Sequence, residues 1–337
     1  MQAEQSQQPC TFLSVPSPFR DSFGFIYPFK MNQQMRQYSR RSFIKASGCV
    51  AGALAGGLYP AKLLGAASLK GGVPLSGHLW VYASKFPPNW DCTPILEQVF
   101  SDFKYAGLEG VELMESNLRH ADVVSRVGEL IQQYEMPVTG TSYNAAMWDK
   151  TKHQEILEDV ELVVERLHKL GGSTFGITVG DAGHIKTVPE LDAQADVLQK
   201  VLKVCDKNKI QANLHNHTFE VENNLHDWKG TIERVPDIKL GPDLNWLIRG
   251  GVDPVWFIKT YGPKIVYLHI RDQDAAGKWT HAVGEGVTDF LAIAQALKEV
   301  NFKGRAAIEL AFEETPTGSV REDWKKSRQY VAKVFGW

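Results

Sequence analysis

Short apolar segments alternate with amphipathic segments along most of the chain, from about residue 76 onward. The amphipathic segments carry apolar residues at helical spacing, as at Val123, Val127 and Ile131. This alternation is typical of a parallel sheet covered by helices. Eight strands are expected, at residues 79–82, 110–113, 137–142, 174–179, 210–214, 240–244, 265–270 and 305–310.

The predicted fold is a (β/α)8 TIM barrel over residues 76–337. Eight strand–helix units in about 260 residues match the usual size of that fold. A doubly wound open sheet is the alternative, and it usually carries a glycine-rich phosphate loop after its first strand. No such loop follows residues 79–82, so the barrel is favoured.

Four consecutive predicted strands carry a ligand-type residue near their carboxyl ends: His215, Asp243, His269 and Glu309. Functional residues of such barrels lie at these ends, so the four are expected to meet at one side of the mouth. Two imidazoles and two carboxylates suit Mn, Co, Fe or Zn better than Ca. A single histidine or glutamate at a strand end is usually only hydrogen-bonded or solvated. Four in succession predict one divalent metal ion.

The segment from His215 to Glu220 holds two histidines and a glutamate within six residues. Residues two apart on a strand face the same side, so His215 and His217 are both expected to face the mouth and Asn216 to face away. Glu220 is expected to anchor the loop. An imidazole titrates near neutral pH, so one histidine can hold the metal while the other acts as a base. The sequence leaves open which does which.

A series of short motifs in this order resembles the sugar phosphate isomerase/epimerase superfamily, whose members have the xylose isomerase-like TIM barrel. The resemblance covers about residues 76–335. It is carried by Gly110 to Leu113, Leu214 to Glu220, Asp243 to Trp246, Tyr267 to Asp272, Val283 to Gly286 and Ile308 to Leu310. The resemblance implies one divalent ion held by glutamate, aspartate, histidine and glutamate on strands five to eight.

The resemblance also implies a reaction, in which two metal-bound glutamates move a proton on the carbon beside a carbonyl. Here His215 stands where the first glutamate is expected, and Trp246 stands where many members carry a substrate-contacting histidine. Only Glu309 of the glutamate pair is present. The expected catalytic residues are Glu309, His217 and Glu112, and the expected substrate contacts are Tyr143, Trp246 and Glu285.

These features favour a metal-dependent isomerase or epimerase of a non-phosphorylated sugar, because no glycine-rich phosphate loop opens a helix near strands seven and eight. The missing glutamate supports an alternative, a lyase or hydratase of 3-keto-glycosides, which needs the metal and one base. A non-catalytic sugar-binding barrel is a third hypothesis. Glu285 also has a second interpretation, as a turn residue between Gly284 and Gly286.

Residues 1–67 are expected to form an N-terminal extension with a twin-arginine export signal. Arg40 and Arg41 precede a weakly apolar, glycine- and alanine-rich run over residues 46–64 and small residues at 65–68, which is typical of that signal. Cleavage is expected near Ala66 or Ala67. The signal implies passage of the folded protein through the twin-arginine translocase to the periplasm.

The formal net charge of −2, without a basic stripe, argues against a nucleic-acid partner. No apolar run reaches the roughly 18 residues that span a bilayer, so no stable membrane anchor is expected. The expected partner is a small carbohydrate substrate, and the sequence is compatible with a homo-oligomer. The four cysteines are too widely spaced for a zinc cage or a redox pair.

Overall fold

The computed structural model describes residues 72–313 and 318–337, which lie within one compact unit, Pro60–Trp337. The export signal predicted in residues 1–67 lies outside the described residues. Among the helices of the described segments, none has the length and apolar character needed to cross a membrane.

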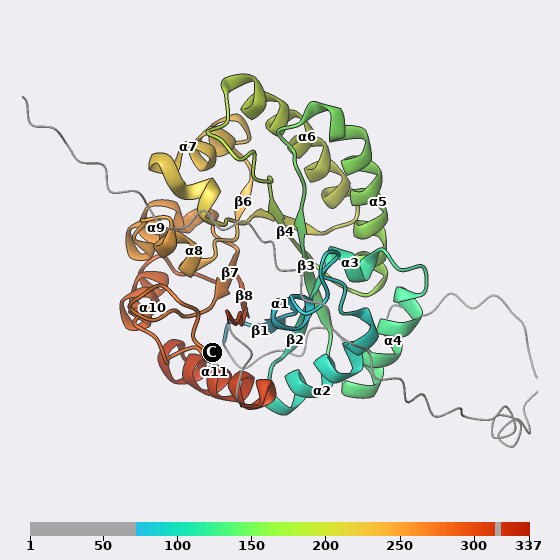
Figure 1. Cartoon of the computed structure of the whole chain (residues 1–337), viewed down its shortest axis with the longest axis vertical. Helices are drawn as coiled ribbons and strands as arrows, with labels where there is room; N and C mark the ends of the chain where they lie inside the picture. Colours follow the sequence, from blue (N-terminus) through green and yellow to red (C-terminus); the bar gives the residue numbers. More distant parts are fainter. Residues whose placement is uncertain (1–71, 314–317) are drawn as a thin grey trace, which may run out of the picture. The chain divides into compact units, whose positions relative to one another are not determined.

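Eight parallel strands form a barrel surrounded by helices, which confirms the predicted fold (Figure 1). The strands pair in the order β6-β5-β4-β3-β2-β1-β8-β7. Parallel bridges from Leu240 to Ile265 and from Asp243 to His269 join the two ends of that order. The strands are β1 (Leu75–His78), β2 (Gly110–Met114), β3 (Val138–Asn144), β4 (Thr174–Thr178), β5 (Gln211–Leu214), β6 (Lys239–Leu240), β7 (Tyr267–Ile270) and β8 (Arg305–Ile308).

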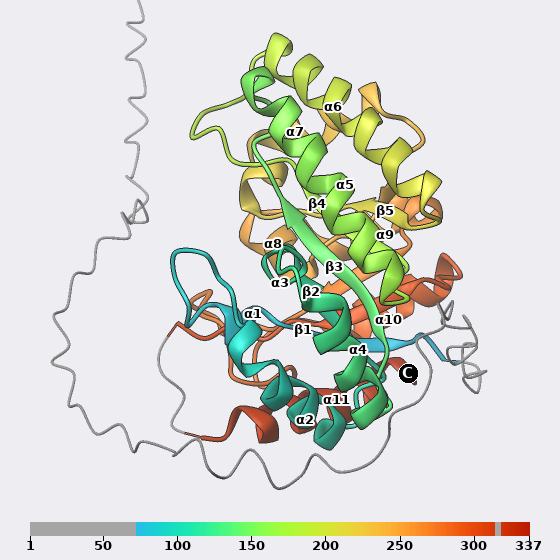
Figure 2. The ribbon, with the colours of Figure 1, turned by 90° about the vertical axis from the view of Figure 1, so that its right-hand side faces the viewer.

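The helices cover the outside of the strands, and short 3-10 turns extend some of them. The helices are α1 (Trp80–Ala83), α2 (Leu96–Ala106), α3 (Glu115–Leu118), α4 (Val123–Tyr134), α5 (His153–Lys169), α6 (Val188–Lys207), α7 (Thr218–Arg234), α8 (Leu244–Arg249), α9 (Pro254–Tyr261), α10 (Phe290–Glu299) and α11 (Val320–Phe335). The 3-10 turns are η1 (Thr93–Ile95), η2 (Lys150–Lys152) and η3 (Gly262–Lys264). Figure 2 shows α4, α5 and α6 along one flank of the barrel, outside the long strand β3.

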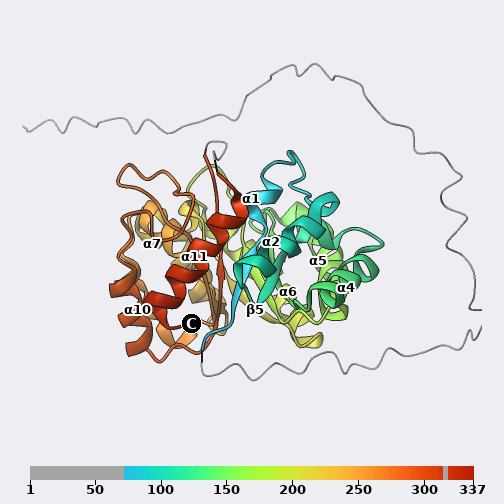
Figure 3. The same cartoon turned by 90° about the horizontal axis from the view of Figure 1, so that it is seen from below.

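Local sequence signals set the bounds of several helices. Thr187 and Glu190 form a capping box at the start of α6, satisfying amide groups that the first helical turn leaves unpaired. α2 ends at Gly107, whose φ of 79° is left-handed and favours glycine. The last helix, α11, packs beside α2 (Figure 3), where the rings of Phe103 and Trp324 meet edge to face at 4.6 Å. This contact joins the end of the barrel to its beginning.

The first strand was predicted four residues too late. The strand is Leu75–His78, and the apolar run that was expected to be the strand begins the short helix α1 instead. All four residues of β1 are buried, but Ser76 and Gly77 interrupt the apolar run by which a buried strand is recognised in a sequence. A side chain at Gly77 would meet the ring of Phe103 at 2.5 Å, so close packing of α2 on β1 requires glycine there. The correction brings His78 to the carboxyl end of the strand.

Two further elements differ from expectation. β6 ends at Leu240, and Asp243 is the N-cap of α8 rather than the end of a long strand. α7 begins at Thr218, inside the segment from His215 to Glu220 that was expected to form a strand end and loop, and it is broken at residues 222–225. Asn223, Asn224 and Leu225 have left-handed backbone conformations at the break, with φ of 52°, 60° and 63°.

Candidate metal centre and barrel mouth

The structure brings the four predicted ligands together at the carboxyl ends of β5 to β8. His215, Asp243 and His269 each offer one ligand atom, and these atoms lie within 4.8 Å of one another. Glu309 joins them, because its Oε2 lies 3.0 Å from His269 Nδ1. All four side chains are buried. The donor set of two imidazoles and two carboxylates fits a divalent transition-metal ion.

The orientation of His269 supports this fit. Its Nε2 lies 2.7 Å from Glu112 Oε2, which also accepts a hydrogen bond of 2.8 Å from the Tyr267 hydroxyl. Its Nδ1 faces the cluster, where it lies 3.0 Å from Glu309 Oε2. Metal-binding histidines commonly use one ring nitrogen for the ion and donate the other N–H to a carboxylate. The hydrogen bond to Glu112 therefore fixes the orientation of the His269 ring.

Glu112 and Glu309 determine the protonation state of His269. Burial acts against a charged imidazole, but Glu112 and Glu309 outweigh it and raise the pKa of His269 to about 10. Burial likewise opposes ionisation of Glu112, and His269 reverses that effect and lowers the pKa of Glu112. In the protein without metal, this pair is therefore an ion pair.

Asp243 has two structural tasks besides its place in the cluster. Its Oδ1 accepts hydrogen bonds of 3.0 Å from the amides of Asn245 and Trp246, so it caps α8. The side chain of Asn216 exchanges hydrogen bonds of 3.4 and 3.1 Å with the backbone of Asp243. The carboxylate is thus fixed by the N-terminus of α8, and the backbone of Asp243 is fixed by Asn216, which follows β5.

Arg271 lies inside the cluster, which the sequence analysis did not foresee. Its guanidinium is buried, its Nε donates a hydrogen bond of 2.8 Å to Asp243 Oδ2, and its Nη2 pairs with Glu309 Oε1. Burial would raise the pKa of Glu309, but Arg271 together with His78 and His269 holds it well below its usual range. The signal was present, because Arg271 follows His269 by two residues and so shares its side of the strand.

His217 faces the mouth beside the cluster. Its side chain is 35% exposed, and its ring lies 5.4 Å from that of His215 and 5.5 Å from that of Trp246. Its Nδ1 has no hydrogen-bond partner. Loss of hydration and the charge of Arg271 lower the pKa of His217 to about 4. The ring is therefore neutral near pH 7 and able to accept a proton.

Glu220 has the anchoring role that was predicted for it. Its Oε2 accepts a hydrogen bond of 2.7 Å from the amide of His217, at the N-terminus of α7. Its Oε1 accepts one of 3.4 Å from the amide of Val179, after β4. The buried carboxyl thus ties the His217 segment to the neighbouring strand end, and it does not join the metal ligands.

His78 is a second site residue that the sequence analysis missed, because the first strand was misplaced. Its Nδ1 accepts a hydrogen bond of 3.2 Å from the amide of Trp80 and lies 3.6 Å from Glu309 Oε1. Its Nε2 lies 3.0 Å from Ser142 Oγ. Since Nδ1 accepts, Nε2 carries the proton and donates to Ser142. The ring of His78 lies 5.2 Å from that of His269.

Trp246 lies at the mouth, where it was predicted to contact substrate. Its ring meets that of Trp279 edge to face at 4.9 Å, and the guanidinium of Arg271 lies 5.4 Å from it. Arg249 covers the ring of Trp279 and pairs with Glu313 at 3.0 Å. Two indoles and two arginines thus form one wall above the candidate ligands.

Two predicted substrate contacts lie elsewhere. Tyr143 is 2% exposed, its ring stacks on Phe175, and its hydroxyl donates to Asp159 of α5 at 3.0 Å. It therefore points into the layer between sheet and helices, which corrects the prediction. Glu285 is exposed and pairs with Lys326 of α11 at 3.3 Å. It fits the alternative of a turn residue.

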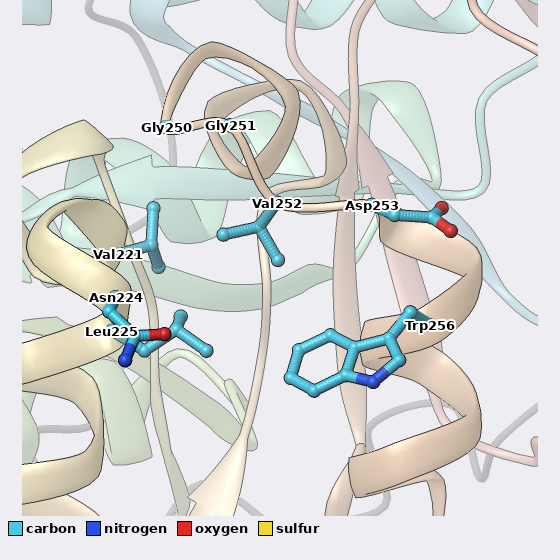
Figure 4. Close-up of a pocket in the computed structure, with 8 residues that line it drawn as sticks. All are labelled: Val221, Asn224, Leu225, Gly250, Gly251, Val252, Asp253 and Trp256. Atoms are coloured by element: carbon cyan, nitrogen blue, oxygen red, sulfur yellow. The ribbon is translucent and has the colours of Figure 1, made fainter. Parts of the chain in front are cut away.

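A hollow of about 310 Å³ lies between the break in α7 and the start of α9 (Figure 4). The indole of Trp256 points into it, opposite Val221 and Leu225. Its walls are partly polar, and they include none of the candidate ligands: Val221, Asn224, Leu225, Gly250, Gly251, Val252, Asp253 and Trp256. The hollow is therefore distinct from the metal cluster.

Comparison with known proteins places the chain among barrels of one type. A family model described as the xylose isomerase-like TIM barrel matches residues 100–334. Among curated proteins, no sequence matches significantly.

Several solved structures share the fold. A sugar phosphate isomerase/epimerase from Parabacteroides distasonis is 14% identical and superposes with a TM-score of 0.64 over 78% of this chain and 95% of that one. The 3-keto-D-glucoside 4-epimerase of E. coli is 16% identical, with a TM-score of 0.60 over 79% and 100%. The D-allulose 3-epimerase of a Methylomonas species is 15% identical, with a TM-score of 0.65 over 77% and 97%.

Proposed function

Because the chain belongs to the xylose isomerase-like TIM barrel family, we propose that it is a metal-dependent isomerase or epimerase of a non-phosphorylated sugar or sugar derivative. One observation carries the proposal: His215, Asp243 and His269 place their ligand atoms within 4.8 Å of one another at the barrel mouth. Structural neighbours named as epimerases of D-allulose and of 3-keto-D-glucoside support a sugar substrate.

In this proposal the ion is Mn, Co, Fe or Zn, and His215, Asp243, His269 and Glu309 would hold it. His269 would bind through Nδ1, since its Nε2 is occupied by Glu112. The ion would supply Lewis-acid polarisation of a carbonyl oxygen. Glu112 is a positioning residue, because its Oε2 is used by His269 and Tyr267 and the side chain is 2% exposed.

His217 is the proposed base that removes the proton beside the carbonyl. Among the site histidines described here, it is the one whose side chain is substantially exposed, and its ring is neutral near pH 7. Glu309 is the proposed second proton-carrying group. Its pairing with Arg271 keeps it ionised and makes it a weak base, so it is expected to carry a proton only when that pairing is broken.

The indoles of Trp246 and Trp279 are the proposed walls for the sugar. Aromatic rings offer large apolar faces and hold a ligand at low conformational cost. A sugar presents apolar C–H groups on one face, and these can pack on the rings.

A second candidate function is elimination or hydration of a 3-keto-glycoside. The observation that favours it is the asymmetry of the site, in which a histidine, His215, stands opposite the single carboxylate Glu309. The other ligand carboxylate, Asp243, is committed to α8 and Arg271. Epimerisation requires proton transfer on both faces of a carbon, whereas elimination requires one base, and His217 suffices for it.

Solvent exchange tests both candidates. The metal-loaded protein is incubated in D2O with free ketohexoses and with 3-keto-glucosides, and deuterium at the carbon beside the carbonyl is measured by NMR. Exchange with formation of the epimer supports the first candidate, and release of water or of the aglycone supports the second. Binding of a sugar without exchange would show a binding protein and contradict both.

Metal analysis tests the proposed ligands, and Tyr143→Phe provides the matched control. Asp243→Ala and His269→Ala are each expected to lose the bound ion, whereas Tyr143→Phe, outside the mouth, is expected to keep it. A full equivalent of metal in both ligand variants would contradict the site.

The proposal includes export to the periplasm through the twin-arginine translocase. It is supported by the paired Arg40 and Arg41 ahead of a weakly apolar segment. Fractionation of cells that express the full chain is expected to find the protein in the periplasm, and the variant Arg40→Lys/Arg41→Lys in the cytoplasm. Finding the wild type and the variant in the same compartment would contradict the proposed export signal.

A further inference from the structure

The carboxylate oxygens of the candidate metal centre already have partners in the described structure. Asp243 Oδ1 accepts two backbone amides, and its Oδ2 accepts the Nε of Arg271 at 2.8 Å. Glu309 Oε1 is paired with Nη2 of the same arginine, and its Oε2 lies 3.0 Å from His269 Nδ1. One guanidinium therefore bridges the two carboxylates that a metal ion would share.

This guanidinium cannot readily leave the site. Arg271 is 3% exposed, and the rings of Trp246 and Trp279 lie 5.4 and 4.9 Å from its central carbon, on the side of the mouth. A buried charge is stable only while it is paired, and an unpaired one is strongly destabilising. In a metal-free protein without Arg271, Asp243 would lose its ion-pair partner and Glu309 would keep His269 alone.

We infer that Arg271 is an internal counter-cation of the metal centre: it holds Asp243 and Glu309 together in the metal-free protein, and a divalent ion must compete with it for their oxygens. The inference rests on the proposed metal site. Its consequence is a centre that stays folded without metal but binds metal more weakly than its donor set would otherwise allow.

Arg249 provides a matched control within the same wall. Its guanidinium also lies against Trp246 and Trp279, at 5.1 and 3.2 Å. Its partners, however, are Glu313 and Gln273, which are not ligands. An effect on metal binding that comes from mere positive charge near the mouth would appear in variants of both arginines, whereas competition for the carboxylates concerns Arg271 alone.

The test compares the wild-type protein, Arg271→Met and Arg249→Met. Mn2+ affinity is measured by isothermal titration calorimetry, and thermal unfolding is followed in chelator and in Mn2+. Arg271→Met is expected to bind Mn2+ at least about tenfold more tightly than wild type, since the ion no longer has to displace a charge-assisted hydrogen bond. It is also expected to unfold at a lower temperature in chelator, and to gain more from Mn2+. Arg249→Met is expected to resemble wild type in both measurements.

Equal or weaker Mn2+ binding by Arg271→Met would overturn the inference while leaving the metal site intact. Absence of Mn2+ binding in both the wild type and Arg271→Met would overturn the metal site and the inference with it. If Arg271→Met does not fold, Arg271→Lys gives the same comparison, because its ammonium cannot bridge two carboxylates with a planar fork. Arg271→Lys is then expected to bind Mn2+ more tightly than wild type, and unchanged affinity would overturn the inference.

Discussion

Lys186 and Arg271 are both buried against carboxylates in this barrel, and their surroundings differ. Lys186 donates to Asp227 Oδ2 at 2.6 Å and to Gln194 Oε1 at 2.7 Å. Gln194 completes that network by donating to Asp227 Oδ1 at 2.8 Å and to Thr231 Oγ1 at 2.7 Å. Arg271 also bridges two acceptors, but beside it Nδ1 of His217 is buried without a hydrogen-bond partner.

The difference separates scaffold from site. The Lys186 network is saturated and joins α6 to α7 outside the strands, so it has no capacity left for a ligand. The Arg271 network leaves one imidazole nitrogen, Nδ1 of His217, without a hydrogen-bond partner, and unsatisfied buried polar atoms are costly unless something else uses them. We therefore expect substitutions in the first network to change stability, and substitutions in the second to change chemistry.

The largest expected effect concerns the unused nitrogen of His217. His217→Gln is expected to lower the rate of deuterium exchange into a bound sugar by about 10²–10⁴-fold, because the base is lost. Its thermal unfolding is expected to stay close to that of wild type. A variant that exchanges at the wild-type rate would show that another group is the base, with Glu309→Gln as the next variant to measure.

In the Lys186 network, a loss of stability without a loss of activity is expected. Asp227→Ala leaves the ammonium of Lys186 buried without its carboxylate, which is expected to cost about 3–5 kcal/mol in the free energy of unfolding. Urea denaturation measures this cost. Exchange activity and metal content of the folded fraction are expected to be unchanged, and a loss of metal would show that the two networks are coupled.

A smaller effect is expected where one residue supports a ligand. Glu112→Gln keeps the shape of the side chain but weakens the acceptor that orients His269. Its metal affinity is expected to fall by about 10–100-fold, the usual loss when a group that orients a metal ligand is changed. Calorimetry against the same metal checks this. Unchanged affinity would indicate that His269 is held by Tyr267 and the backbone alone.

The smallest effect is expected at Tyr143, which serves the scaffold. Tyr143→Phe removes one hydrogen bond to Asp159, and Arg119 continues to hold that carboxylate at 2.7 Å. A loss of about 1 kcal/mol in stability is expected. The KM for the sugar should not change, and a raised KM would return Tyr143 to the substrate site.

The ligand positions could be predicted from sequence because alternation of strands and helices fixes where strand ends fall. His215, Asp243, His269 and Glu309 each follow an apolar run, and the fold then brings such ends together. His78 could not be found in the same way, since Ser76 and Gly77 hide the strand before it. Glycine occupies that strand for a packing reason that is visible only once Phe103 is in place.

Other features depend on contacts that the sequence does not display. Arg271 follows His269 by two residues, a spacing that exposed strand residues can also have. Its burial depends on Asp243 and Glu309, which pair with it in the structure. The break in α7 is similar: Asn223 and Asn224 tolerate left-handed backbone, but Leu225 does so rarely. Tyr143 was assigned to the mouth because it ends a strand, yet its ring turns to the helical side.

The barrel is joined between β6 and β7 by the bridges that include Asp243 and His269. The amides of Val266 and His269 donate across this seam to Leu240 and Pro242 at 2.8 and 3.0 Å. Since two of the candidate ligands lie on either side of the seam, an ion that binds both would also hold the barrel shut. Slower hydrogen exchange at these two amides would then report occupancy of the centre, without any need for a substrate.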